Sequence, residues 1–503
     1  MSTLIRGARV LTLDPQDTEH ATADILVAEG RIQAIAPNLD AGTATIIEAA
    51  GLLAMPGLVN GHFHSQQNLM AGSVPGLPLE LFMLHEVPPP GVPGPTPDLV
   101  RLQTLLGAVE MLRNGVTAVH DDAFHNPGPT CPGIDAMMAA YAEAGIRATV
   151  TINHPNVVEH AKYPFLADIL PAAIRAEMDA APRIEASELM DLYRWFHTTW
   201  HGAAEGRLRI GVANSAPQRV TPDLFRQLSD FSRQHDLPFT VHILETKLQR
   251  VFGMECLGES LVQYVHRLGL LDERMLVVHA VWVDEADMAL LAASGCTIAH
   301  NPVCNLRLGS GTMPFRRLRN HGIPIALGTD ERSADDTTDM WAVMKMAGLV
   351  HQVTDPDWTT WPQPIEILRA ATSGGTRGMR RPGNRQGEGT LQPGAQADLI
   401  LVDLDTLPFT PLNDLRRQLV YSAGPACVAL TMVAGRVVME RGRVTTVEIP
   451  ALRAAIRTHQ PAITAMVQAT AAAAARLHPY YAEMVRRTSA TDIGFTRWGS
   501  ANP

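Results

Sequence analysis

The sequence predicts an α/β protein: a (β/α)8 barrel of the TIM type with a small β-sandwich domain built from both ends of the chain. Two observations predict this fold class. Short apolar runs alternate with amphipathic stretches through the middle of the chain, and strand-like segments without intervening helices occur near both ends. A chain of 503 residues is long enough to bury the core of such a barrel and to carry additions to it.

The small domain is predicted from segments in which apolar and polar residues alternate. These segments are 4–13, 24–28 and 31–35 near the N-terminus, and 397–403, 428–433 and 435–439 far downstream. Glu29-Gly30 lies between two of them and is typical of a tight turn. Neither group alone has enough strands to shield a core. We therefore expect residues 1–57 and 388–449 to combine in one β-sandwich.

The barrel is predicted over residues 58–387, where eight short apolar runs have the length of buried parallel strands. The eight runs are 52–59, 116–119, 146–152, 208–212, 239–241, 275–278, 297–299 and 323–327. Amphipathic stretches separate several of them: 99–112, 188–200, 224–235 and 286–293. An open, doubly wound sheet is the competing architecture, but no glycine-rich phosphate turn follows the first strand.

The last segment, residues 450–503, is predicted to be a helical extension. Its centre, 463–477, is rich in alanine, which has the highest intrinsic helix propensity. We expect this helix to pack on the barrel or on a neighbouring subunit.

Composition and charge exclude several classes of function. The net charge is −10 and no basic run occurs, so a nucleic-acid partner is not expected. No run of eighteen apolar residues predicts a membrane span, and the N-terminus does not resemble a secretion signal. The five cysteines have no metal-site spacing and are expected to be reduced thiols. The expected location is cytoplasmic.

Polar residues follow several predicted strands at their C-terminal ends, where TIM-type barrels place active sites. His62 and His64 are two residues apart on the first strand, so both imidazoles face the same side. His242 and Glu245 follow the fifth strand, His279 the sixth and Asp330 the eighth. Taken singly, each is as well explained as a loop hydrogen-bonding residue or a turn. Together on one rim, imidazoles and a carboxylate predict a divalent transition metal.

These motifs, with several neighbours, make the chain similar to the amidohydrolase superfamily. Within it the chain most resembles the branch of chlorotriazine hydrolases and S-adenosylhomocysteine, guanine and cytosine deaminases, over roughly residues 1–445. The motifs that carry the resemblance are Pro56-Gly-Leu-Val-Asn-Gly-His62-Phe-His64, His242-Ile-Leu-Glu245, Val278-His279, His300-Asn-Pro-Val-Cys-Asn305, Leu327-Gly-Thr-Asp330 and Pro393-Gly-Ala-Gln-Ala-Asp-Leu-Ile-Leu-Val-Asp403.

The resemblance implies a ligand set and a division of labour. The metal is expected on His62, His64, His242 and Asp330, with one position open for water. Asp330 would also take a proton from that water, His279 would orient it, and Glu245 would protonate a ring nitrogen and then the leaving group. Binuclear relatives bridge two metals with a lysine on the fourth strand. Here that strand, 209–217, has no lysine, so one ion per chain is expected, either Zn²⁺ or Fe²⁺.

The residues that would contact the substrate are less strongly indicated. Glu331 follows the metal-binding Asp330 where cytosine deaminases have an acidic residue that contacts the ring; a surface pair with Arg332, or an Arg332–Asp336 contact, is the competing interpretation. Gln66 and His85 are further candidates for substrate binding. Other polar residues expected at the mouth are Glu86, His120, Asp121, Asp122, Asn301 and Asn305.

The expected function is metal-dependent hydrolysis of a C–N or similar C–X bond in a small nitrogen heterocycle, most simply a hydrolytic deamination. A ring-opening hydrolase of cyclic amides and a dechlorinating hydrolase are the enzymatic alternatives. A catalytically inactive scaffold is a third interpretation, which the retained ligands His62, His64, His242 and Asp330 disfavour. We expect a homodimer or homotetramer, because relatives are often oligomeric, and the substrate itself is not specified by the sequence.

Overall fold

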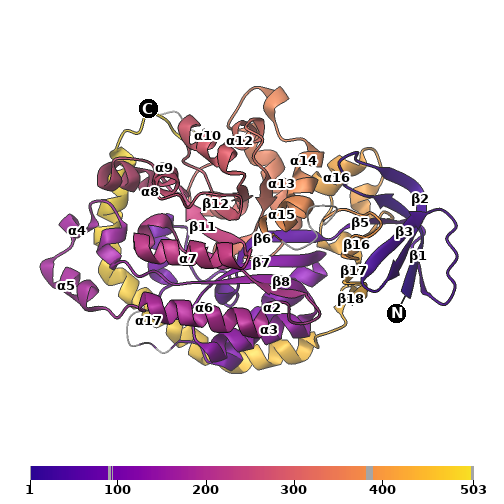
Figure 1. The fold of residues 1–503 in the computed structure, drawn as a ribbon, viewed down its shortest axis with the longest axis horizontal. Coiled ribbons are helices and arrows are strands. Elements are labelled where there is room, and N and C mark those ends of the chain that lie inside the picture. The colour runs from indigo at the N-terminus through magenta and orange to yellow at the C-terminus, as the bar shows by residue number, and fades with distance from the viewer. Residues whose placement is uncertain (1, 89–91, 93, 381–388, 500–503) are drawn as a thin grey trace.

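The structure is a computed structural model that describes residues 2–88, 92, 94–380 and 389–499. The barrel occupies the centre of Figure 1, a smaller sheet lies at one end, and the long C-terminal helix runs along the barrel's outside. The predicted boundary between residues 387 and 388 lies outside the described residues.

The smaller sheet is assembled from both ends of the chain, as expected. Its nine strands have the order β19-β18-β17-β16-β5-β1-β2-β3, with β4 paired to β1. The bounds are β1 (Ser2–Leu11), β2 (Glu19–Ala28), β3 (Arg31–Ala36), β4 (Thr45–Glu48), β5 (Leu52–Pro56), β16 (Leu399–Asp403), β17 (Val428–Val433), β18 (Arg436–Glu440) and β19 (Arg443–Val444). The antiparallel pairing of β5 with β16 joins the two halves, and a separate apolar cluster that includes Ile25, Ala54 and Leu401 fills the sheet's core.

The barrel strands form two five-stranded parallel sheets, so the barrel that was expected as one eight-stranded sheet is not closed in this structure. One sheet has the order β15-β6-β7-β8-β9 and the other β10-β11-β12-β13-β14. The bounds are β6 (Leu58–His64), β7 (Val116–Phe124), β8 (Arg147–Asn153), β9 (Leu208–Ile210), β10 (Val212–Asn214), β11 (Phe239–Ile243), β12 (Met275–His279), β13 (Thr297–His300), β14 (Ile325–Leu327) and β15 (Asp330–Glu331).

Glycines explain where the two sheets separate. Gly211 divides the fourth predicted strand into β9 and β10, and its N–H bonds to Val150 while the next N–H, of Val212, bonds to Pro238 on the other side. Gly328 divides the eighth into β14 and β15, and a Cβ there would lie 2.8 Å from the backbone nitrogen of His62. The chain itself continues from one sheet to the other at both points.

The first predicted barrel strand also needs correction. Residues 52–56 belong to β5 of the smaller sheet, and the barrel strand β6 begins only at Leu58. Gly57 lies between them with space for no side chain, because a Cβ would fall 2.2 Å from the Thr117 Cγ2. The apolar run 52–59 is therefore divided between a strand of the smaller sheet and a strand of the barrel.

Helices cover the barrel and begin where the sequence supplies caps. α2, α3 and α7 each start at a Thr-Pro or Thr-Cys-Pro step, whose threonine hydroxyl accepts an N–H of the first turn. The α-helices are α1 (Leu79–Phe82), α2 (Pro97–Arg113), α3 (Cys131–Ala144), α4 (Leu166–Ile169), α5 (Ala172–Ala180), α6 (Ala186–Trp200), α7 (Pro222–Gln234), α8 (Lys247–Phe252), α9 (Leu261–Arg267), α10 (Glu285–Ser294), α11 (Pro302–Arg307), α12 (Phe315–Asn320), α13 (Met340–Leu349), α14 (Pro364–Arg369), α15 (Gly375–Gly378), α16 (Leu415–Tyr421) and α17 (Ile449–Ala490).

The C-terminal helix α17 is longer than the alanine-rich stretch suggested and packs on its own barrel. It contacts α2 at one end and α1, α4 and α8 at the other, where Tyr481 and Met484 are buried among apolar residues. The segment that follows it, residues 491–499, lies against α8, where the Arg250 guanidinium packs over the Phe495 ring (Figure 1). Within the described ranges, no helix combines the length and apolarity needed to cross a membrane.

Candidate active site

The predicted ligands meet at the C-terminal ends of the barrel strands. β6 ends at His64, β11 carries His242 one residue before its end, and β12 ends at His279. The two-residue strand β15 places Asp330 beside Phe63, between His62 and His64. Parallel neighbours in register bring these ends to one level, so residues far apart in the sequence converge on one point.

Three imidazoles face one another at this point. The ring centroid of His62 lies 4.7 Å from that of His64 and 4.9 Å from that of His242. One nitrogen from each of these three rings lies within 4.8 Å of the other two. In a second group, one nitrogen each of His62 and His279 and one carboxylate oxygen of Asp330 also lie within 4.8 Å of one another. The Oδ1 of Asp330 is 3.4 Å from the Nε2 of both His62 and His64.

This cluster fits a divalent transition metal by its own chemistry. His62 is fully buried, yet neither of its ring nitrogens has a hydrogen-bond partner. An unpaired buried polar group is costly unless a ligand satisfies it. Three nitrogens and one carboxylate oxygen are the donors that zinc and ferrous iron accept in catalytic sites. His62, His64, His242 and Asp330 would hold the ion.

Asp122 supports two of these histidines from behind. Its backbone carbonyl lies 2.6 Å from the Nδ1 of His64, and its Oδ2 lies 3.8 Å from the Nδ1 of His242. The other carboxylate oxygen accepts hydrogen bonds from Thr151 and Asn153 at 2.7 and 2.9 Å. Such outer partners fix the orientation and tautomer of metal-binding imidazoles. Asp122 was expected at the mouth, but it is fully buried beneath the histidines.

Glu245, His279 and Asp330 form the second half of the site. The Nε2 of His279 is 3.3 Å from Glu245 Oε2 and 3.6 Å from Asp330 Oδ2. The Nδ1 of His279 accepts a hydrogen bond from the side-chain amide of Asn305 at 3.0 Å. A neutral His279 therefore carries its proton on Nε2, pointing at the two carboxylates.

The environment pulls the two carboxyl groups in opposite directions. Burial, reinforced by the charge of Asp330, raises the pKa of Glu245 well above its usual value. Burial also acts to raise the pKa of Asp330, but His62 and His64 outweigh it and hold that pKa well below the usual range. Burial lowers the pKa of His279 to about 3. The site thus holds a protonated acid, an ionised carboxylate and a neutral imidazole side by side.

The backbone around these groups is strained. His279 has φ 74°, Ala280 48°, Asp330 65°, and Leu244, immediately before Glu245, 54°. Left-handed backbone is unfavourable for side chains with a Cβ and persists where the surrounding structure enforces it. Three segments at the site, those of Leu244, His279 and Asp330, adopt this unfavourable backbone. In this conformation the side chains of Glu245, His279 and Asp330 point into the mouth of the barrel.

Comparison with known proteins identifies the family. A model of the Amidohydrolase family matches residues 53–438, most of the chain. The chain belongs to the amidohydrolase family. The predicted resemblance is therefore confirmed.

Among this amidohydrolase's relatives are nucleoside deaminases. It is 32% identical over 459 residues to a 5-methylthioadenosine/S-adenosylhomocysteine deaminase of Nitratidesulfovibrio vulgaris, covering 90% of this chain and 96% of the relative. It is 27% identical to a 5'-deoxyadenosine deaminase of Methanosarcina mazei, covering 88% and 94%. An adenosine deaminase structure from Xanthomonas campestris with bound zinc superposes with a TM-score of 0.79 at 26% identity, covering 92% and 98%.

These likenesses confirm the predicted reaction class, a metal-dependent deaminase acting on C–N bonds. A zinc-containing atrazine chlorohydrolase from Arthrobacter aurescens also superposes, with a TM-score of 0.80 over 92% of this chain and all of that one. At 24% identity it shows a shared fold alone.

Glu331 lies inside the amidohydrolase site. It is 8% exposed, and its carboxyl group is hydrogen-bonded to that of Glu86 from the first loop. Glu86 also accepts a hydrogen bond from the Ser333 hydroxyl at 2.5 Å. Burial and the neighbouring carboxylates raise the pKa of Glu331 well above its usual value. The surface interpretation of Glu331 is therefore wrong.

The competing Arg332 contacts are absent as well. Arg332 pairs with Glu110 at 3.2 Å and donates to the carbonyl of Asn68. Asp336 lies 3.7 Å from Arg307 instead.

Gln66 and His85 occupy different positions from Glu331. The Oε1 of Gln66 accepts the N–H of Phe124 and its Nε2 donates to Ser65, so its polar atoms already serve the loop. His85 lies in a short 3₁₀ turn, Met83–His85, that packs against α17. Of the contacts described for residues 2–88, none joins His85 to the histidine cluster.

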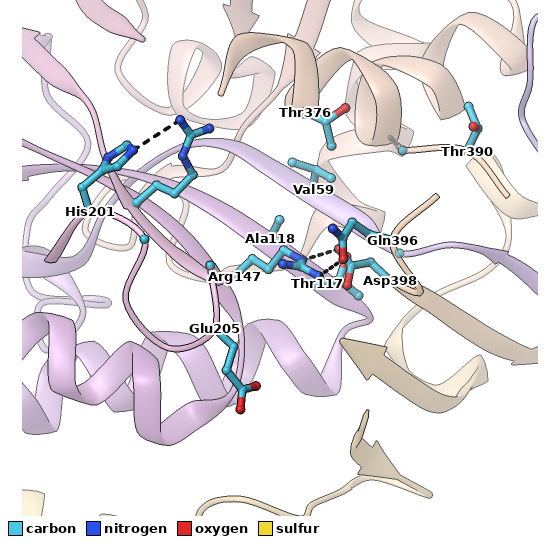
Figure 2. A pocket seen from close by; sticks show the side chains of 15 residues that line it. Val59, Thr117, Ala118, Arg147, His201, Glu205, Thr376, Thr390, Gln396 and Asp398 are labelled. Carbon is cyan, nitrogen blue, oxygen red and sulfur yellow. Dashed lines mark hydrogen bonds and ion pairs between the residues drawn. The ribbon is translucent and has the colours of Figure 1, made fainter. Parts of the chain in front are cut away.

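A cavity of about 260 Å³ lies at the opposite end of the barrel strands. It is lined by the starts of β6, β7 and β8 and by residues of the smaller sheet. Figure 2 shows Arg147 at this junction, bonded to both Gln396 and Asp398. The cavity belongs to the interface between the barrel and the smaller sheet, and its lining includes His201 but none of His62, His64, His242 and His279.

Sequence reasoning overlooked Glu80. This buried carboxyl group in α1 accepts a hydrogen bond at 2.6 Å from Thr246, the residue after Glu245. Burial raises its pKa. Nothing in the spacing of Glu80 distinguishes it from a solvated residue of a short helix, because its partner is 166 residues away in the sequence.

Proposed function

We propose that this amidohydrolase removes the amino group from the adenine ring of an adenosine-type nucleoside such as 5-methylthioadenosine, S-adenosylhomocysteine or 5'-deoxyadenosine. Relatives named for these activities match about nine-tenths of the chain. The observation that carries the proposal is the trio Glu245, His279 and Asp330 beside three converging histidines. Products would be ammonia and the corresponding 6-oxo nucleoside.

The metal-binding residues in this proposal are His62, His64, His242 and Asp330, and one ion per chain is expected. Zn²⁺ is favoured over Fe²⁺, because the superposed adenosine deaminase structure contains zinc. A bound ion of this kind lowers the pKa of water towards neutrality, which supplies the nucleophile.

Proton movements are assigned to the trio. Glu245, protonated because it is buried, donates to the ring nitrogen next to the carbon under attack. Asp330, ionised, accepts a proton from the attacking water. His279 directs its Nε2 hydrogen at the same place and orients the water. The C–O bond forms and the C–N bond to the amino group breaks; one proton of the water leaves on ammonia and the other restores Glu245.

Substrate contacts are proposed for Glu331 with Glu86, and for Gln66 and His85 on the surrounding loops. The buried pair of carboxyl groups offers hydrogen-bond acceptors and a shared proton at one wall of the site. Hydroxyl groups of a ribose or an N–H edge of the base would match those acceptors. Glu331→Gln is expected to raise KM more than it lowers kcat.

We also propose that the two five-stranded sheets act as one (β/α)8 barrel over residues 58–387, since their strand ends supply a single site. Residues 1–57 and 388–449 are proposed as the β-sandwich and residues 450–503 as the helical extension. Homodimers or homotetramers remain our proposal for the assembly.

An ammonia-release screen tests the proposed function. The substrates are adenosine, 5-methylthioadenosine, S-adenosylhomocysteine and 5'-deoxyadenosine, with atrazine, melamine and hydantoin as representatives of the other reactions. We expect ammonia from at least one nucleoside and a loss of it with Glu245→Gln. Chloride release from atrazine, or ring opening of hydantoin without ammonia, at a higher kcat/KM would overturn the proposal.

A further inference from the structure

The segment after α17 contacts loops that carry the proton-handling residues. Arg497 lies in this segment, beyond residue 438 where the family match ends. Its Nε donates to the carbonyl of Val281 at 3.0 Å and its Nη2 to that of Val283 at 2.6 Å. Val281 and Val283 follow His279 by two and four residues on the same loop. The Arg497 side chain therefore binds two carbonyl groups of this loop, those of Val281 and Val283.

That loop begins with strained backbone. His279 and Ala280 both have positive φ, 74° and 48°, and the three residues that follow, including Trp282, are fully buried. Two such residues in a row would relax towards ordinary backbone unless external contacts opposed it. The described contacts that oppose it include the two hydrogen bonds from Arg497.

The same loop also braces the strand end of Glu245. The N–H of Ala280 donates to the carbonyl of Ile243 at 3.1 Å, and the N–H of Trp282 donates to that of Leu244 at 2.8 Å. Leu244 immediately precedes Glu245 and has positive φ itself. A shift of residues 280–283 would therefore move both His279 and Glu245.

The C-terminal segment holds the neighbouring loop as well. Trp498 donates its indole N–H to the carbonyl of Gly309 at 2.9 Å, and the N–H of Thr312 donates to the carbonyl of Arg497 at 2.9 Å. Residues 309–312 follow α11, whose Asn305 donates to the Nδ1 of His279. The indole of Trp498 also packs edge-on against Trp282, with ring centroids 5.0 Å apart.

Gly311 shows how closely the segment fits. A Cβ at this position, which has φ 111°, would lie 3.0 Å from the Arg497 oxygen and 3.1 Å from its Cβ. The approach requires a residue without a side chain. Both loops that flank His279 are thus pinned to one short piece of chain.

We propose that Arg497 is a positioning residue for deamination: it fixes the loop after β12 and so holds His279 and Glu245 at the spacing the proton transfers need. This inference rests on the proposed function. Arg497 contacts neither the ligand histidines nor, by the geometry above, the reacting atoms; it acts through the backbone of residues 281–283. The requirement is for a planar group that reaches two carbonyls, which lysine meets only in part.

Kinetics of Arg497→Ala, Arg497→Lys and Arg476→Ala in the full-length, metal-loaded enzyme test the proposal. Arg476 is the matched control, since it lies on α17 and forms a two-bond pair with Glu177 on the outside of the molecule. Arg497→Ala is expected to lower kcat about 10- to 100-fold with KM changed less than about 2-fold. The kcat of Arg497→Lys should lie between those of Arg497→Ala and the wild type, and the kcat of Arg476→Ala should equal that of the wild type. All variants should contain one metal ion per chain.

Hydrogen exchange supplies a readout that needs no substrate. Peptides covering residues 279–284 should exchange at least about 10-fold faster in Arg497→Ala than in the wild type, while those covering α2 stay unchanged. Equal exchange in both proteins would overturn the inference, even if no substrate were turned over. So would an unchanged kcat, or a kcat that falls only in proportion to lost metal. Should Arg497→Ala not fold, Arg497→Lys carries the same comparison.

Discussion

The two ends of the barrel strands contain similar polar side chains in opposite circumstances. At the N-terminal end, Arg147 donates hydrogen bonds to Asp398 and Gln396 beside the smaller sheet, and Asp398 also accepts the N–H of Ala434. At the C-terminal end, the ring nitrogens of His62 and the Nδ1 of His242 make no hydrogen bond, although carboxylate oxygens lie 3.4 Å from His62 and 3.8 Å from His242. Positive φ values occur at both ends, at Leu244, His279, Ala280 and Asp330 beside the site and at Ala204 and Glu205 beside the cavity, so backbone strain does not distinguish the two ends.

The difference separates stability from function. A polar network whose groups are all paired joins two parts of a fold and resists change. Buried polar groups left without a hydrogen bond cost stability, and they persist where a ligand or a reaction uses them. Substitutions at the two ends should therefore change different observables.

Removal of a ligand at the unpaired end should have the largest effect. His62→Ala is expected to abolish stoichiometric metal binding and to lower kcat by at least about 1000-fold, because an imidazole from the centre of the cluster is lost. Metal analysis and kinetics on the purified protein measure both. If the variant retained one metal ion per chain and wild-type activity, His62 would not be a metal ligand.

Loss of the acid should come next. Glu245→Gln is expected to lower kcat about 100- to 10,000-fold while one metal ion remains bound, because the amide cannot donate the ionisable proton. The wild-type pH profile provides a second check. Since burial raises the pKa of Glu245 and the protonated form is active, kcat should fall as pH rises through that raised pKa. A variant with wild-type kcat would assign the proton donation to another group.

A smaller effect is expected one layer behind the ligands. Asp122→Asn should weaken metal binding about 10-fold, because the carboxylate faces the Nδ1 of His242, whereas the backbone carbonyl that contacts His64 is unchanged by the substitution. Metal-buffer titration measures the Kd directly. Thr151→Val, which removes one hydrogen bond to Asp122, should weaken metal binding less than Asp122→Asn does. A larger loss of metal affinity in Thr151→Val than in Asp122→Asn would contradict the role assigned to the carboxylate.

Substitutions at the N-terminal end of the barrel strands should lower the stability of the fold without changing catalysis. Arg147→Ala leaves Asp398 largely buried without its partner and should cost about 3 kcal/mol of unfolding free energy, seen as a lower Tm. The exposed pair Arg194–Asp191 is the control, and Arg194→Ala should cost under about 0.5 kcal/mol. Folded Arg147→Ala should keep kcat/KM within about 2-fold. A large loss of kcat with Tm unchanged would break the separation between the two ends.

Much of the site was predictable because its signals are local. His62 and His64 lie two residues apart on one strand, and His242, His279 and Asp330 each lie at the end of an apolar run, so the predicted barrel brings them to one rim, while their role as ligands was implied by the family resemblance. The assembly of the smaller sheet from both ends of the chain was also predictable, since neither end had enough strands by itself, but β5, the strand that makes the junction, was assigned to the barrel.

The remainder depends on contacts that spacing does not encode. The Glu86–Glu331 pair, the Thr246–Glu80 bond and the Arg497 clamp each join segments more than 160 residues apart. The separation of the barrel at Gly211 and Gly328 reflects how closely backbones approach there, which a pattern of apolar residues does not report. Gly57 likewise divides one apolar run between two sheets.

The pairing of β5 with β16 also sets an order of events at the ribosome. Roughly 340 residues of chain separate the two strands, and the barrel lies between them. At about 5–20 residues per second, β5 waits on the order of 20–70 s for its neighbour to be synthesised. During that interval the edge of β5 that β16 will cover is an open template for other chains. Expression at lower temperature lengthens the wait, so chaperone supply should limit the yield of this protein more than the stability of its finished barrel.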